Sequence, residues 1–96
     1  MYRVLYHKLV LSEDFKKVSK VDQRKIVSTI KKKLANDPES FGKPLVSDLK
    51  GYFRLRIGFY RVIYSVSKKE VTVMVVKIGL RKDLKAYLEA AKRLGL

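Results

Sequence analysis

The sequence predicts a single α+β domain of 96 residues, in which helices pack on an antiparallel sheet. Apolar residues recur at helical spacing between residues 11 and 35 and again between residues 83 and 93. Three β-rich segments follow one another between residues 48 and 78, and their short connections favour an antiparallel meander. The expected element order is therefore β-α-α-β-β-β-α, with the helices on one face of the sheet.

The N-terminal segment is expected to form one short strand followed by one helix. Residues 2–7 alternate in character with the period of a strand. The next segment carries apolar residues at helical spacing, namely Leu11, Phe15 and Val18. Glu13 and Asp14 fall near the start of this expected helix, where acidic side chains interact favourably with the helix dipole.

A second helix is expected to begin near Ser19 and to end near Ala35. Ser19 and Asp22 resemble a capping box, and Pro38 follows shortly after the expected end. The buried stripe of this helix is expected to comprise Ile26, Val27, Ile30 and Leu34. Almost no loop separates the two helices, so we expect them to form an antiparallel helical hairpin packed on the sheet.

The C-terminal half is expected to form three strands and one helix. The strands are predicted at about residues 48–57, 60–66 and 71–78, and the helix at about residues 83–93. The helix has two neighbouring apolar stripes, Leu84, Leu88 and Ala91 in one and Tyr87, Ala90 and Leu94 in the other.

Charge is the strongest overall signal of function. The chain has 23 Lys and Arg against nine Asp and Glu, which leaves a net charge of +14 and favours a polyanionic partner. The basic residues are spread over every segment, which favours nucleic acid over a membrane surface.

The composition also argues against several kinds of site. With no cysteine and one histidine, the chain lacks the ligands of a usual transition-metal cluster, and we expect no metal and no cofactor. No apolar run is long enough to span a bilayer, and the first residues lack the pattern of a signal peptide. We therefore expect a cytoplasmic protein.

The segment from residue 51 to residue 64 concentrates the side chains suited to phosphate chemistry. Period-two alternation places Tyr52, Arg54 and Arg56 on one face of a strand, and Arg61 lies on the strand that returns after Gly58. Guanidinium groups match phosphate oxygens and stay charged, which suits them to stabilise a phosphorane-like transition state. They transfer protons poorly because their pKa exceeds about 12. Alternatively, these arginines are only the exposed face of an amphipathic strand.

Several other residues are candidates with a structural alternative. His7 is the only imidazole and is expected to be structural or merely exposed. Tyr60 and Tyr64 share a strand face with Val62 and Val66 and are expected in the core. Arg81 follows the last strand and could be a linker residue, whereas Tyr87 could belong either to the core or to a site.

The string LKGYFRLRIGFYRVIY, residues 49–64, resembles the central hairpin of the RelE/ParE superfamily of bacterial and archaeal toxins. Arg81 and Tyr87 continue the pattern of that superfamily, and their combination favours the RelE branch, with its RelE-like and YoeB-like mRNA interferases, over the ParE branch. The resemblance covers essentially the whole chain and implies a RelE-like fold. It further implies the toxin of a type II toxin–antitoxin system.

The resemblance implies a metal-independent endoribonuclease that cleaves mRNA in the ribosomal A site through attack of the 2′-hydroxyl, and thereby inhibits translation. It implies that Arg54 and Arg61 contact the phosphate. Arg81 would stabilise the transition state or the leaving group, and Tyr87 would lie close to the attacking nucleotide. Arg56 would belong to the same RNA-binding patch.

One position departs from the pattern. Tyr52 stands where some RelE members carry a lysine of the basic site. Either Tyr52 stacks on a base, or neighbouring lysines compensate, or activity is weaker. The candidate compensating residues are Lys50, Lys82 and Lys85.

The resemblance also implies partners: an acidic RelB-like antitoxin that wraps the toxin, together with the ribosome and mRNA. We expect a monomeric toxin within a toxin–antitoxin hetero-oligomer. Two other functions stay open, a ParE-type inhibitor of DNA gyrase on the same fold and a basic RNA-binding module without catalysis.

Overall fold

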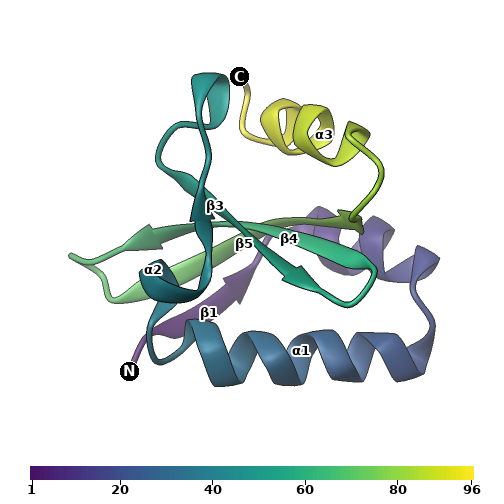
Figure 1. Cartoon of the computed structure of the whole chain (residues 1–96), viewed down its shortest axis with the longest axis horizontal. Coiled ribbons are helices and arrows are strands. Elements are labelled where there is room, and N and C mark those ends of the chain that lie inside the picture. The colour runs from purple at the N-terminus through teal and green to yellow at the C-terminus, as the bar shows by residue number, and fades with distance from the viewer.

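A five-stranded sheet in the order β1-β5-β4-β3-β2 crosses the centre of the computed structural model, which describes residues 1–96 (Figure 1). Its strands are β1 (Arg3–Tyr6), β2 (Lys43–Pro44), β3 (Tyr52–Ile57), β4 (Tyr60–Ser67) and β5 (Thr72–Leu80). The helical elements are η1 (Val10–Asp14), η2 (Phe15–Lys17), α1 (Lys20–Leu34), α2 (Pro38–Phe41), η3 (Ser47–Leu49) and α3 (Lys85–Arg93). The predicted α+β class and element order are thus confirmed, with short additions.

The main core lies between α1 and the sheet. Its largest fully buried members are Tyr64, Ile26, Ile30, Leu34, Ile78, Val10, Val62, Val73 and Val75. Ser19 caps α1, since its side chain accepts a hydrogen bond from the Asp22 backbone N–H at 3.2 Å. The capping prediction is therefore confirmed, whereas Leu11 and Val27, both expected in apolar stripes, are exposed.

The first helical segment is shorter and less regular than expected. It is one π-helical turn, η1, followed by the 3₁₀ turn η2, and it ends before Val18. Val10 takes the buried place that was expected for Leu11, because the π-helical winding shifts which residues face the sheet.

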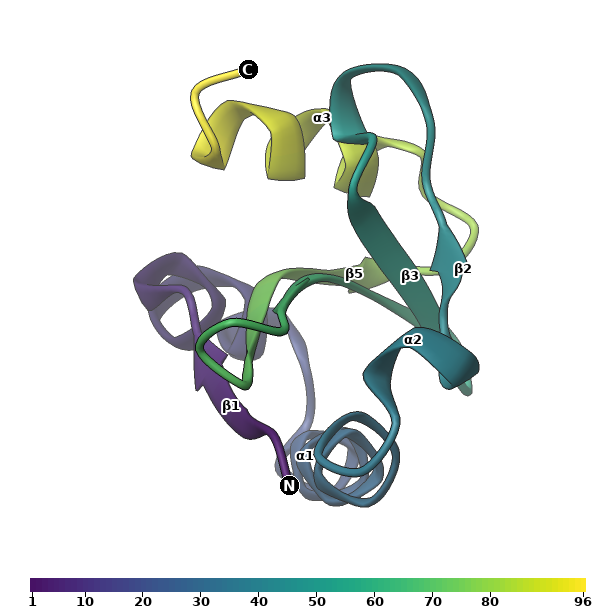
Figure 2. The same ribbon diagram turned by 90° about the vertical axis from the view of Figure 1, so that its left-hand side faces the viewer.

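Helices cover both faces of the sheet, which corrects the expectation of a single covered face. Figure 2 shows α3 on the side of the sheet opposite α1. A second core there contains Ile63, Val76, Ala86 and Ala90. The physical reason is that β4 and β5 carry apolar residues on both faces, so neither face can be left to water.

The helix α3 packs with the second of its two candidate stripes. Ala86 and Ala90 are buried, whereas Leu84 and Leu88 are each 70% exposed. The approach to β5 is close, because a Cβ added to Gly79 would lie 3.0 Å from the Cβ of Ala86. Small residues on both sides of this contact therefore decide which stripe faces the sheet.

The sheet is mixed rather than purely antiparallel. β1 pairs with β5 in parallel, from Arg3 opposite Thr72 to Tyr6 opposite Val75, while the other three strand pairs are antiparallel. The two strands are far apart in sequence, and the long connection between them leaves room for the crossover that a parallel pair requires.

A β-bulge in β5 sets the direction of a charged side chain. Ile63 pairs with Lys77 and Tyr64 pairs with Val75, which leaves Val76 without a partner on β4. Val76 faces the core under α3 in normal alternation with Met74, and the extra residue places Ile78, in place of Lys77, on the main core. Lys77 then points to Asp14 and Glu89 instead of into the main core.

None of the helices combines the length and the apolar character that crossing a membrane requires.

Candidate active site

The β3–β4 hairpin presents its arginines to the side of the sheet that α3 covers. Leu55 and Ile57 of β3 face the main core. Arg54 and Arg56 alternate with them and therefore face the opposite side, as the sequence pattern predicted. Arg56 lies directly opposite Arg61 in the strand register. The two-residue turn begins at Gly58, whose φ of +59° lies in the left-handed region that favours glycine.

Tyr87 of α3 contacts two of these arginines. The guanidinium carbon of Arg61 lies 4.6 Å from the centre of the Tyr87 ring, in a cation–π contact. Arg54 Nη1 lies 3.5 Å from the hydroxyl oxygen of Tyr87, at the long end of hydrogen-bond distance. Residues far apart in sequence thus meet in one cluster of two guanidinium groups and one phenol.

Arg61 is buried without a counter-charge. The residue is only 4% exposed, and its Nε and Nη1 atoms have no hydrogen-bond partner. A buried guanidinium with free N–H groups is costly unless something compensates it, and the π-face of Tyr87 compensates it only in part. The arrangement therefore has unused donor capacity suited to an anion.

A cavity opens beside this cluster. It has a volume of about 510 Å³ and lies between α3 and the loop that joins β2 to β3. Its lining includes Arg54, Tyr87, Leu45, Val46, Asp48 and Leu88. A smaller hollow of about 200 Å³ lies nearby and is lined by Arg54 and Arg56 among others, so Arg54 borders both spaces.

The other predicted site residues form no side-chain hydrogen bond or cation–π contact with this cluster. The backbone N–H of Arg81 donates to the carbonyl of Phe59 at 2.7 Å, which anchors Arg81 beside the hairpin turn. Exposed side chains without hydrogen bonds or ion pairs belong to Arg81, Lys82, Lys85 and Lys50. Tyr52 is half-buried and packs against the core under α3.

Tyr60, Tyr64 and His7 have structural contacts, as expected. Burial raises the pKa of the Tyr64 hydroxyl, which donates to the carbonyl of Pro38 at 2.6 Å. The hydrogen bond to Asp22, at 2.9 Å, raises the pKa of Tyr60. His7 Nδ1 accepts the N–H of Leu9 at 3.1 Å.

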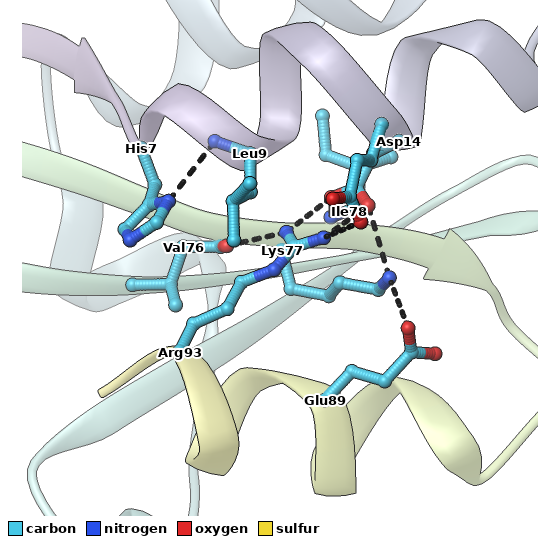
Figure 3. A network of polar contacts seen from close by, with 9 residues as sticks. His7, Leu9, Asp14, Val76, Lys77, Ile78, Glu89 and Arg93 are labelled. Atoms are coloured by element: carbon cyan, nitrogen blue, oxygen red, sulfur yellow. Dashed lines mark hydrogen bonds and ion pairs between the residues drawn. The ribbon is translucent and has the colours of Figure 1, made fainter. Parts of the chain in front are cut away.

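A buried ion cluster that the sequence did not indicate ties α3 to η1 and β5 (Figure 3). Asp14 accepts two hydrogen bonds from Arg93, at 2.7 and 2.8 Å, one from Lys77 Nζ at 2.9 Å and one from the Ile78 backbone N–H at 2.9 Å. Lys77 also pairs with Glu89 at 3.1 Å. Asp14 is therefore a buried anchor at the end of η1, and the expectation that it complements a helix N-terminus is wrong.

Burial and hydrogen bonding shift the pKa of Asp14 in opposite directions. Burial alone would raise the pKa of the carboxyl, but the hydrogen bonds from Arg93, Ile78 and Lys77 outweigh it and hold the pKa below its usual value. The same interaction with Asp14 raises the pKa of Arg93. The sequence showed locally only the adjacent pair Glu13 and Asp14, because both basic partners of Asp14 lie far along the chain.

Comparison with known proteins identifies the family. The model of the ParE toxin family of type II toxin–antitoxin systems matches residues 4–85. Toxin RelG of Mycobacterium tuberculosis is 35% identical over 51 residues, which cover 53% of this chain and 59% of RelG. The match therefore spans little more than half the length of that relative.

Solved structures agree with this result. A chain in the archaeal RelE–RelB complex from Pyrococcus horikoshii OT3 is 30% identical, with a TM-score of 0.62 over 84% of this chain and 96% of that chain. A mutant of E. coli toxin RelE in the free state is 20% identical, with a TM-score of 0.75 over 97% of both chains, and shows the shared fold alone. The chain therefore belongs to the ParE toxin family of type II toxin–antitoxin systems, as a RelE-type member of the RelE/ParE superfamily.

Proposed function

We propose that this chain is a ribosome-dependent endoribonuclease that cleaves mRNA in the A site and thereby inhibits translation. The observation that carries the proposal is the buried guanidinium of Arg61, which has two nitrogen atoms without partners and lies against Tyr87, whose hydroxyl Arg54 contacts. Donors held in a water-poor site are most effective on a charge that develops during reaction. A phosphate diester under attack develops such a charge.

In this reaction the 2′-oxygen of a nucleotide attacks the adjacent phosphorus, and the 5′-oxygen of the next nucleotide leaves. The products are a 2′,3′-cyclic phosphate and a free 5′-hydroxyl. Arg54 and Arg61 bind the non-bridging oxygens, and Arg81 stabilises the transition state or the leaving oxygen. Tyr87 contacts the attacking nucleotide from its place beside Arg61 and Arg54.

Catalysis of proton transfer is the weak part of this site. Arginine side chains stay protonated at neutral pH, and Tyr60 and Tyr64 have raised pKa values and structural hydrogen bonds. The site therefore relies on charge stabilisation and on a substrate geometry supplied by the ribosome. That reliance accounts for the proposed dependence on the ribosome and needs no metal ion.

The surrounding basic residues bind the RNA backbone in this proposal. Arg56 extends the arginine cluster along the hairpin, while Lys50, Lys82 and Lys85 are exposed and free of acidic partners. Tyr52 is half-buried under α3, so stacking on a base involves only its exposed edge.

The proposed protein partner is an acidic RelB-like antitoxin, bound to a single toxin domain within a hetero-oligomer in the cytoplasm. The archaeal relative was solved as a RelE–RelB complex. Net charge of +14 and exposed apolar residues next to the cavity, Val46 and Leu88 among them, suit a segment that is both acidic and amphipathic.

Programmed ribosomes carrying a 5′-labelled message test the proposed activity. We expect fragments that end within the A-site codon. Cleavage should persist when EDTA is added at a concentration that leaves the ribosomes intact. Arg61→Ala and Arg81→Ala should each cause a sharp loss of product. Arg24→Ala is the matched control, because Arg24 is an exposed arginine of α1 without an ion pair. Normal cleavage by both site variants would rule the proposal out.

A ParE-type gyrase inhibitor is the second candidate, because the matching family model is that of ParE toxins. It predicts inhibited supercoiling by purified gyrase and no A-site product. A non-catalytic RNA-binding module predicts RNA affinity that falls steeply with salt and neither of the other two effects.

A further inference from the structure

Helix α3 links the ion cluster to the proposed active site. It carries Tyr87 in its first turn, and Arg93 is its last residue. At a rise of 1.5 Å per residue, the two residues lie about 9 Å apart along the helix axis. A short helix moves as a rigid unit, so any contact that fixes Arg93 also limits where Tyr87 can lie.

The fully buried apolar contacts of α3 are small. Its two buried side chains, Ala86 and Ala90, are single methyl groups, and Leu88 points to solvent. Tyr87 and Leu94 pack against the same core but are only partly buried. Burial of so little apolar surface stabilises a helix position only weakly and leaves its rotation and sliding poorly defined.

The contacts of Arg93, in contrast, are directional. Its planar guanidinium forms the two bonds to Asp14 and a third, from Nη1 to the carbonyl of Val76, at 3.0 Å. The side chains of Arg93 and Asp14 are only 5% and 2% exposed. Glu13, Asp14 and Glu89, three of the nine acidic residues, gather around Arg93 and Lys77.

We propose that Arg93 and Asp14 are positioning residues, which act through α3 to hold Tyr87 against Arg61 and Arg54. They do not touch the substrate. This inference rests on the proposed function for its effect on cleavage, but the position of Tyr87 is measurable without any cleavage.

The position of Tyr87 is measured by ¹⁹F NMR of the chain labelled with 3-fluorotyrosine, with the Tyr87 signal assigned through Tyr87→Phe. We expect Arg61→Ala to move the Tyr87 signal, because it removes the cation over the ring. Arg93→Ala should move it as well, toward the position of free fluorotyrosine, while the signal of Tyr64 in the main core stays in place. Lys92→Ala is the matched control, since it removes an exposed charge from the same helix and should leave both signals unchanged.

Conservative variants separate positioning from general loss of structure. Arg93→Lys keeps the charge without the planar fork and should restore the Tyr87 signal only in part. If Arg93→Ala unfolds the chain and the Tyr64 signal collapses, Glu89→Gln decides instead. It removes only the charge of the half-exposed partner of Lys77, and it should move the Tyr87 signal in the same direction by less.

A double-mutant cycle then measures the effect on A-site cleavage. We expect Tyr87→Ala and Arg93→Ala each to slow single-turnover cleavage by about a hundredfold, the scale of a small misplacement. The double variant should be no slower than Tyr87→Ala, because Arg93 acts only through Tyr87. Additive losses, faster cleavage by Arg93→Ala, or an unmoved Tyr87 signal would each overturn the inference. If the wild type does not cleave, the proposed function fails, and the NMR comparison still decides the positioning role.

Discussion

Replacing Asp14 with asparagine tests the energetic role of the buried ion cluster. Asp14→Asn keeps the size of the side chain and an oxygen for the Ile78 N–H, but it leaves Lys77 and Arg93 with only the more exposed Glu89 and Glu13. Removing one partner of a buried ion pair costs about 3–5 kcal/mol, and the retained hydrogen bond favours the lower end, about 3 kcal/mol. That loss is a large fraction of the stability of a domain this size.

The pH dependence of this loss has a definite sign. The folded-state pKa of Asp14 is lowered, so the carboxylate stabilises the fold fully above its unfolded pKa of about 3.9. That contribution disappears as the pH falls through the folded pKa. The stabilities of the wild type and Asp14→Asn should therefore differ most at neutral pH and converge in acid.

Urea unfolding at a series of pH values measures this difference. Asp37→Asn is the matched control, because Asp37 is exposed and forms no ion pair, and it should change stability by less than about 0.5 kcal/mol. A stability gap for Asp14→Asn that stays constant from neutral to acid pH would show that the carboxylate charge contributes nothing, and would refute the reasoning.

Three further substitutions test the fold around the site. Tyr64→Phe leaves the buried carbonyl of Pro38 without its donor and should lower the free energy of unfolding by about 1–3 kcal/mol, as urea unfolding measures, without slowing A-site cleavage. Gly79→Val drives a side chain into Ala86 and should push α3 away from the sheet, so we expect slower cleavage and a displaced Tyr87 signal in ¹⁹F NMR. Ser19→Ala removes the cap of α1 and should cost about 1 kcal/mol in thermal or urea unfolding, with cleavage unchanged.

The parts of the fold that could be predicted from sequence depend on short-range patterns. Alternation along β3 correctly placed Arg54 and Arg56 on one face, because side chains of a strand alternate whatever the rest of the chain does. The cap at Ser19 and the turn at Gly58 are equally local. Each of these features is specified by only a few neighbouring residues.

The parts that could not be predicted depend on long-range geometry. Two stripes of α3 are similarly apolar, and the close approach at Gly79 decides between them only once β5 is in place. The bulge at Val76 turns Lys77 to Asp14, and no local pattern marks it. Asp14 reaches partners 63 to 79 residues away, so its local setting suggested a helix terminus instead.

The features of the candidate site likewise divide into those that local sequence patterns predict and those that depend on long-range geometry. The sequence pattern indicated Arg54, Arg61 and Tyr87, and the structure brings their side chains into contact. The burial of Arg61 under the Tyr87 ring could not be predicted, because it depends on how α3 docks. Arg81 lies beside the hairpin turn, and its role stays a prediction.

Single-turnover A-site cleavage by Arg61→Ala tests the central claim most directly, with Arg24→Ala as the control and the ¹⁹F signal of Tyr64 as proof of folding. If the buried guanidinium stabilises the charge on the phosphate, Arg61→Ala should cleave about a hundredfold to a thousandfold more slowly than the wild type, while Arg24→Ala is unchanged. A folded Arg61→Ala that cleaves at the wild-type rate would contradict the claim.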